Sequence, residues 1–239
     1  MGDKAFNVRW HRWHTCSLCE QEYHGVVSCA LGWAGWKTYL GRPEGDWNRG
    51  AAMNILGNGL GYAKHHEEAL SVQEAELSMR RRLGDSEDNI LIAQSNLAST
   101  YDALGRHQDA MRISRDVYFG NLRLEGAEHE GTLIEANNYA STLVKLERFK
   151  EAKALLRRTI PVALRVVGDS EDLTLKMRWI YAEALYEDGR ATLDDLREAV
   201  TTLEDAERIA RRVLGGAHPT TMGIEDHLRG ALAKLLAQS

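Results

Sequence analysis

Three cysteines and a histidine near the N-terminus are the residues best suited to chemistry. Cys16, Cys19, His24 and Cys29 have two, four and four residues between them, and three thiolates with an imidazole at this spacing could close a tetrahedral zinc site. Against this reading, no glycine precedes His24, and Cys29 lies in an apolar run that predicts a helix to about Tyr39. A buried cysteine behaves as a small hydrophobe. We therefore expect a structural segment without metal or other cofactor, with zinc at these four residues as the alternative.

Elsewhere the candidate motifs lack the context that catalysis needs. Residues 57–61 read Gly-Asn-Gly-Leu-Gly, but no strand precedes them and no Lys-Ser/Thr follows, as a phosphate-binding loop requires. Residues 65–68 read His-His-Glu-Glu, which is not the His-Glu-x-x-His spacing that places two ligands on one helical face. We predict that the protein is not an enzyme.

Composition narrows the class of partner. The chain has 30 Lys+Arg against 35 Asp+Glu, without the basic excess that favours nucleic acid. No apolar run approaches the roughly 20 residues that cross a bilayer, and no apolar signal core follows Met1, so we expect no membrane insertion and a cytoplasmic location. Five of the six tryptophans lie in the first 47 residues, and residues 41–46, which contain Gly and Pro, are the expected joint between two regions.

A repeat of 42 residues organises the remainder of the chain. Gly84, Gly126 and Gly168 have this spacing, and residues 96–100 match residues 138–142 at the same distance. Gly215 follows 47 residues after Gly168, which indicates an insertion of five residues around 188–191. Each unit reads as two amphipathic helices with a short polar turn between them. Such hairpins must stack to bury their apolar faces, so the sequence predicts a solenoid.

The segment that follows two of these glycines reads Gly-Asp-Ser-Glu-Asp at 84–88 and again at 168–172. The other two copies of this position keep mainly the glycine, so we interpret the segment as a turn between helices and not as a cation-binding loop. The glycine suits a left-handed helix end, and the Asp and Ser can cap the next helix. Three further expectations are a cap formed by Thr192 and Asp195, a kink at Pro161, and Arg157 near the end of its helix.

The pattern Asn96-Leu97-Ala98-x-x-Tyr101-x-x-Leu104-Gly105-Arg106-x-x-Asp109-Ala110 resembles the tetratricopeptide repeat (TPR), in the 42-residue form of kinesin light chains. In that subfamily the segment between repeats reads Leu-Gly-x-x-His-Pro-x-Thr, which residues 214–221 match. The resemblance implies an all-α fold, a right-handed superhelical solenoid of antiparallel helical hairpins. We expect an N-terminal helical segment at 1–46, about four repeats at 47–221 and a capping helix at 222–239.

In TPR arrays the first helices of the repeats line a concave groove that binds peptides, with Asn side chains on the peptide backbone. The resemblance therefore implies a non-enzymatic scaffold or adaptor for a peptide or a partner subunit, and the chain could also be built into a larger assembly. The groove positions that it implies are Asn54, Asn58, Asn96, Ser99, Asn137, Asn138, Ser141, Lys145, Arg178 and Glu183.

The stretch from Trp13 to Cys19, Trp-x-x-Cys-x-Leu-Cys, is similar to the last ligand pair of a RING-CH finger. Such a finger needs eight ligands, of which only Cys16 and Cys19 can be carried over. The similarity implies an alternative function, a substrate-recruiting part or remnant of a ubiquitin ligase. A finger remnant without metal is accordingly a third interpretation of the cysteine segment.

Overall fold

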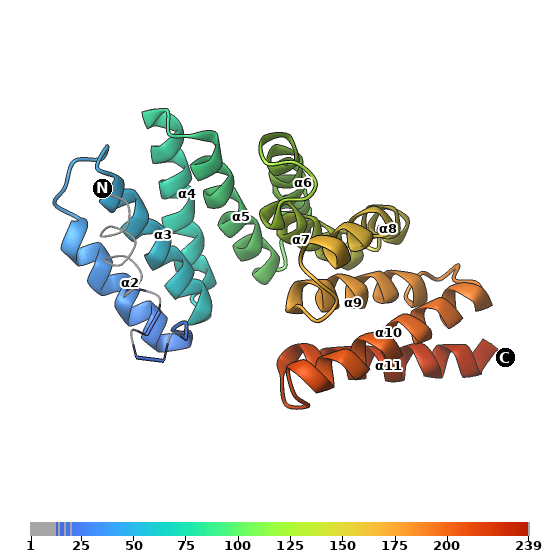
Figure 1. The fold of residues 1–239 in the computed structure, drawn as a ribbon. Helices are drawn as coiled ribbons and strands as arrows, with labels where there is room; N and C mark the ends of the chain where they lie inside the picture. The colour runs from blue at the N-terminus through green and yellow to red at the C-terminus, as the bar shows by residue number, and fades with distance from the viewer. Residues whose placement is uncertain (1–12, 14, 17, 20, 239) are drawn as a thin grey trace. The chain divides into compact units, whose positions relative to one another are not determined.

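The computed structural model describes residues 13, 15, 16, 18, 19 and 21–238. In this part of the chain the regular elements are helices, accompanied by one isolated antiparallel bridge between Thr15 and Glu22. In chain order the helices are α2 Gly25–Tyr39, α3 Trp47–Tyr62, α4 His66–Leu83, α5 Glu87–Ala103, α6 His107–Leu124, α7 Glu130–Lys145, α8 Phe149–Val166, α9 Asp172–Tyr186, α10 Leu193–Val213 and α11 Pro219–Gln238 (Figure 1). The predicted all-α fold of helical hairpins is confirmed.

The chain forms two compact units, Met1–Ile113 and Ser114–Ser239, and the boundary falls within α6. In the first unit, α3 packs against α2 and α4, and α5 packs against α4. Leu56, Leu60 and Ala69 form one buried cluster, which the half-buried Cys29 and Trp36 join. The cluster therefore ties α2 to the first repeat hairpin.

Two glycines permit the close crossing of α2 and α3. A Cβ added at Gly59 would lie 2.6 Å from the carbonyl oxygen of Ser28, and one added at Gly32 would lie 2.9 Å from the Cα of Leu56. Side chains do not fit at such distances, so the two backbones approach because both positions are glycine.

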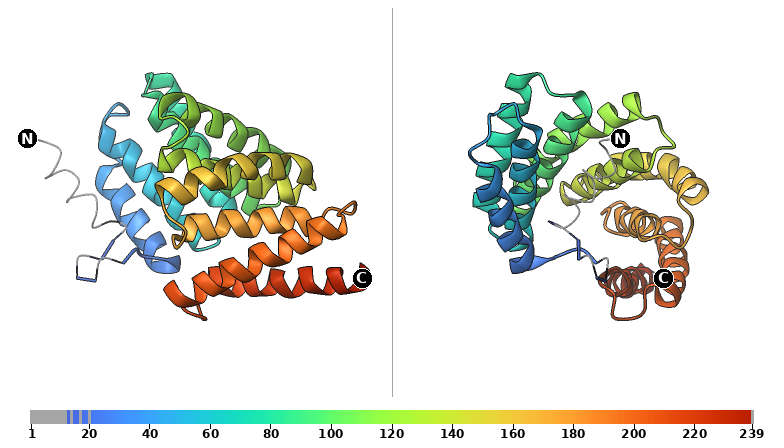
Figure 2. Two further views of the ribbon diagram at one scale, coloured as in Figure 1. Left: turned by 45° about the vertical axis from the view of Figure 1, so that its right-hand side comes forward. Right: turned by 60° about the vertical axis from the view of Figure 1, so that its left-hand side comes forward.

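In the second unit α7 packs on α8 and α9, while α10 lies between α9 and α11 (Figure 2). Its core is formed by fully buried side chains from every one of these helices, among them Leu133, Leu156, Leu175, Leu203 and Ile224. The expected closing helix at the C-terminus is α11, which covers α10 and also contacts α9.

The repeat prediction accounts for the local structure of most turns. Gly84 ends α4 in the left-handed region with φ of 65°, and the Ser86 hydroxyl accepts a hydrogen bond from the backbone of Asn89 at the start of α5. Thr192 and Asp195 form the predicted cap, in which each side chain accepts from the other residue's backbone N–H. The inserted residues lengthen the turn between α9 and α10, as expected.

Two local predictions are wrong. In the second Gly-Asp-Ser-Glu-Asp segment Gly168 has positive φ, but α9 begins at Asp172, so Glu171 is the N-terminal cap and forms no side-chain cap hydrogen bond. Ser170 therefore does not repeat the role of Ser86. Arg157 lies in the middle of α8 and not near its end, because the helix continues through Pro161 to Val166. The predicted kink at Pro161 stays a prediction.

Among the described residues, no helix combines the length and the apolarity that are needed to cross a bilayer.

Candidate functional site

Three of the predicted groove residues lie together in the first unit. Asn58 of α3 and Asn96 and Ser99 of α5 line one pocket of about 290 Å³. The other lining residues come from the same two helices and from α4: Gly57, Gly61, Tyr62, His66, Gln73, Thr100 and Ala103. Helices α3 and α5 are the first helices of consecutive hairpins, so the repeat places the amides of Asn58 and Asn96 and the hydroxyl of Ser99 on one surface.

The polar groups of this pocket suit a peptide backbone. An Asn or Gln amide both donates and accepts hydrogen bonds, as an extended peptide requires. The side-chain oxygen of Gln73 is buried and has no hydrogen-bond partner within the described residues. An orphaned buried acceptor is costly, so Gln73 is a polar group that the packing of the unit alone does not satisfy.

Asn54, the fourth predicted residue of the first unit, lies one helical turn before Asn58 and accepts a hydrogen bond from its amide at 3.3 Å. Asn54 lines a second pocket of about 180 Å³ with Tyr23, Ser28 and Asn58. It also acts on Glu76 of α4: burial raises the pKa of Glu76, and the cation of Arg80, followed by the amide of Asn54, opposes that rise. Asn54 therefore contributes to the internal polar structure of the unit as well as to its surface.

In the second unit, the predicted residues lie on two helices, α7 and α9, which pack against each other. Those on α7 are Asn137, Asn138, Ser141 and Lys145. Burial raises the pKa of Glu183 on α9, Glu187 raises it further and Lys145 lowers it, so Lys145 and Glu183 are electrostatic neighbours.

Arg178 is the exception on α9. Its guanidinium lies 3.9 Å from a carboxylate oxygen of Asp205 on α10, in a separate pocket that α8, α9 and α10 form. The fold therefore does not group Arg178 with Lys145 and Glu183.

Sequence reasoning missed Gln73 and His66, because the repeat resemblance implies groove residues on first helices only, whereas both belong to α4. A search for polar residues on the apolar face of the second helix could have found Gln73, which is only 3% exposed.

The cysteine segment forms a small turn. The backbone N–H of Cys16 donates to the carbonyl of Gln21 at 2.8 Å, beside the bridge of Thr15 with Glu22. Hydrogen bonds from the backbone of Cys19, and then of Leu18, lower the pKa of Cys16 to about 7. A thiol of that pKa is partly ionised at neutral pH.

The four residues at zinc-ligand spacing do not form a cluster. Cys29 packs with the apolar residues between α2 and α3, and the ring of His24 meets that of Tyr62 edge to face. Over the residues with described positions, no group of three or more Cys, His, Asp or Glu side chains is arranged to hold a metal ion. In this structure Cys16, Cys19, His24 and Cys29 are therefore not grouped as zinc ligands, and the absence of zinc stays a prediction.

Comparison with known proteins supports the helical-repeat fold. The family model for the tetratricopeptide repeat matches residues 136–172, which span α7, α8 and the start of α9. No curated protein matches the chain. The structure of BtubC (BKLC) from P. vanneervenii is similar with a TM-score of 0.67 and 17% identity, over 88% of this chain and 86% of that one.

Two further structures have the same type of fold. One is a protein of Podosopora anserina named for kinesin light chain and its nearly identical TPR-like repeats, with a TM-score of 0.60 and 20% identity over 78% of this chain and 85% of that one. The other is a Rap protein complexed with Competence and Sporulation Factor, with a TM-score of 0.52 and 17% identity over 89% of this chain and 59% of that one. The TPR-like, kinesin-light-chain-like architecture is confirmed, whereas the resemblance to a RING-CH finger is not shown.

Proposed function

We propose that this protein is a non-enzymatic interaction scaffold that binds an extended segment of a partner protein in the pocket between α3, α4 and α5. The observation that carries the proposal is the meeting of Asn58, Asn96, Ser99 and Gln73 in one pocket. Repeat folds supply surfaces of this type, and the Rap structure shows a similar fold in complex with a separate factor.

Polar amides on three helices favour main-chain recognition over recognition of a charged side chain. Asn58, Asn96 and Gln73 are neutral, and the pocket holds no Asp, Glu, Lys or Arg. A segment with its backbone exposed, such as a strand or an unfolded tail, can match such a set of donors and acceptors. The ligand class that we infer is therefore an extended peptide, with the identity of its side chains fixed outside this pocket.

Gly61 offers a way to block the pocket without disturbing the fold. It lines the cavity near the end of α3, and an added Cβ would meet no atom within 4 Å. Gly61→Leu should fill the pocket, and Asn96→Ala should remove an amide. Gly189→Leu is the matched control, since Gly189 also has open space around it but lies in the turn before α10.

The experiment is affinity purification of the wild-type chain and these variants from the native source, followed by mass spectrometry. A partner retained by the wild type and by Gly189→Leu should be lost with Gly61→Leu and weakened with Asn96→Ala. Circular dichroism should show the same helicity and melting temperature for all four proteins. If the same partners are recovered at the same level with Gly61→Leu, this pocket is not the binding site.

A further inference from the structure

The pocket that Arg178 lines belongs to the unit Ser114–Ser239, where α8, α9 and α10 form its walls. It measures about 290 Å³, near the lower end of the range for ligand sites. Arg157, Ile160 and Pro161 come from α8, Arg178 and Tyr181 from α9, and Glu198, Thr201, Thr202 and Asp205 from α10. Two guanidinium groups thus face one cavity.

Arg178 is a cation whose hydrogen-bonding capacity is unused. Its side chain is only 15% exposed, yet it donates no hydrogen bond to any residue that the structure describes, and its one carboxylate contact, with Asp205, is 3.9 Å long. A hydrogen bond between nitrogen and oxygen is about 2.7–3.2 Å long, so Asp205 does not satisfy it. Asp205 instead accepts a hydrogen bond from Arg208 at 2.8 Å. Burial accordingly lowers the pKa of Arg178, despite the nearby Asp205.

A chain of hydrogen bonds links the residues of the opposite wall. Arg157 donates from Nε to the Tyr181 hydroxyl at 2.8 Å, and that hydroxyl donates to Glu198 at 2.6 Å. Burial, followed by the hydrogen bond to Glu198, raises the pKa of Tyr181 to about 12, so the phenol keeps its proton. The side chain of Arg157 is 56% exposed, which leaves its terminal nitrogens accessible.

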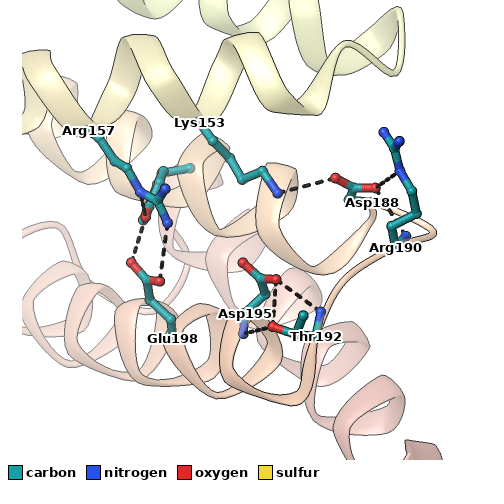
Figure 3. Close-up of polar contacts among 8 residues, drawn as sticks. Lys153, Arg157, Asp188, Arg190, Thr192, Asp195 and Glu198 are labelled. Atoms are coloured by element: carbon teal, nitrogen blue, oxygen red, sulfur yellow. Dashed lines mark hydrogen bonds and ion pairs between the residues drawn. The ribbon is translucent and has the colours of Figure 1, made fainter.

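The position of α10 is fixed beside this wall. Figure 3 shows Lys153 and Arg157 of α8 directed toward Asp188 and Glu198, while Thr192 and Asp195 cap the start of α10. The Lys153 to Asp188 pair is 3.2 Å long, and both side chains are at most 15% exposed. Two ion-pair contacts and a helix cap therefore link α8 to α10 and to the turn before it.

The charges of the pocket select the type of anion. Arg157 and Arg178 are balanced by Glu198 and Asp205. A single carboxylate could pair with Arg178 in place of the long contact to Asp205. Any anion in the pocket also faces Glu198 and Asp205, and a doubly charged phosphate is repelled by them about twice as strongly as a carboxylate. The hydroxyls of Thr201 and Thr202 add donors for the same group.

We propose that this pocket binds a carboxylate group of a partner peptide, with Arg178 as its main ligand and Arg157 and the two threonine hydroxyls completing the site. The site does not depend on the pocket in the first unit. It accepts either an acidic side chain or a peptide C-terminus, since both present the same group.

The test uses the full chain with nitrogen-15 label and follows the Nε–Hε signals of its arginines by NMR. The probes are four short peptides: Ala-Glu-Ala blocked at both ends, Ala-Ala-Ala with a free C-terminus, blocked Ala-Gln-Ala, and the blocked phosphoserine analogue. We expect saturable shifts of the Arg178 signal with the first or the second probe and none with the glutamine peptide. Equal shifts with the glutamine peptide, or tighter binding of the phosphoserine peptide, overturn the carboxylate assignment.

Variants separate binding from folding. Arg178→Gln should lower the affinity for the carboxylate probe at least about tenfold. Arg197→Gln is the control and should leave the affinity unchanged, because Arg197 of α10 pairs with Asp194 outside the pocket. Asp205→Asn removes the internal competitor and should tighten binding about threefold or more. Because Asp205 is half exposed, this variant keeps the proposal testable if Arg178→Gln does not fold. Unchanged affinity in Asp205→Asn and in a folded Arg178→Gln overturns the proposal.

Discussion

Replacing Arg80 with methionine is expected to destabilise the first unit more at pH 7 than at pH 5, by at most about 3 kcal/mol and about 1 kcal/mol respectively. Arg80 pairs with Glu76 at 2.8 Å within α4 and with Asp85 at 2.6 Å beyond the helix end. Glu76 is fully buried. Methionine keeps much of the packing of the arginine stem but leaves the Glu76 carboxylate without its cation.

The size of the effect follows from protonation. Burial already raises the pKa of Glu76 above its usual 4.5, and loss of Arg80 should raise it further. A carboxyl whose pKa is higher in the folded state costs stability as pH rises above 4.5, because folding must then recover a proton or bury a charge. The cost grows by about 1.4 kcal/mol per pH unit, which gives at most about 3.4 kcal/mol at pH 7 and about 0.7 kcal/mol at pH 5.

Urea unfolding followed by circular dichroism and tryptophan fluorescence at the two pH values measures the difference. The double variant Glu76→Gln with Arg80→Met should lose the added pH dependence, since no carboxyl remains to titrate. Arg81→Met is the matched control, because Arg81 is exposed in the same helical turn, and it should change stability by less than about 0.5 kcal/mol. A destabilisation by Arg80→Met that is equal at pH 5 and pH 7 would refute the reasoning.

Three further predictions concern other parts of the chain. Gly59→Ala should destabilise the first unit by about 1–3 kcal/mol, because the added methyl group meets the Ser28 carbonyl. Gly61→Ala on the same helix should stabilise the unit by about 0.5–1 kcal/mol, because its methyl group meets no other atom. Thermal melts compare the two variants, and equal melting temperatures would contradict the close crossing of α2 and α3. Burial lowers the pKa of His227, which meets the Tyr186 hydroxyl at 2.8 Å against the opposing charges of Glu187 and Asp226, so stability should fall as pH drops below 6.5. An NMR titration of the His227 ring with a midpoint above 6.5 would refute this. Elemental analysis of the purified protein should find zinc well below one ion per chain, and a stoichiometric amount would restore the knuckle interpretation.

The repeat spacing predicted the helices well because each hairpin repeats the same local rules. The 42-residue glycines lie at positions of positive φ, and the alanines at 98, 140 and 182, which have the same spacing, are buried. Both features depend on backbone geometry and side-chain size, which can be read from residue type alone. The second Gly-Asp-Ser-Glu-Asp segment shows the limit of this reasoning, because α9 begins one residue later than the period implies and the cap changes with it.

The candidate sites were only partly predictable. Asn58, Asn96 and Ser99, which alignment of the first helices had placed on one surface, line one pocket, whereas their role in binding stays a prediction. The alignment could not show that Arg178 faces α10, because orientation around α9 depends on where that helix begins and on which neighbours pack against it. The sequence pattern likewise predicted Arg157 near the end of its helix. It lies at mid-length instead, because α8 continues through Pro161.

The glycine crossing of α2 and α3 has a practical consequence for anyone who shortens this chain. The tryptophan-rich composition ends near the joint at residues 41–46, which invites a cut there to isolate the repeats. Such a cut would remove the partner that α3 contacts through Gly59 and would uncover Leu56 and Leu60, two buried leucines. A fragment that begins at Trp47 is therefore expected to be prone to aggregation. Any shortened or grafted form of the repeats should include α2.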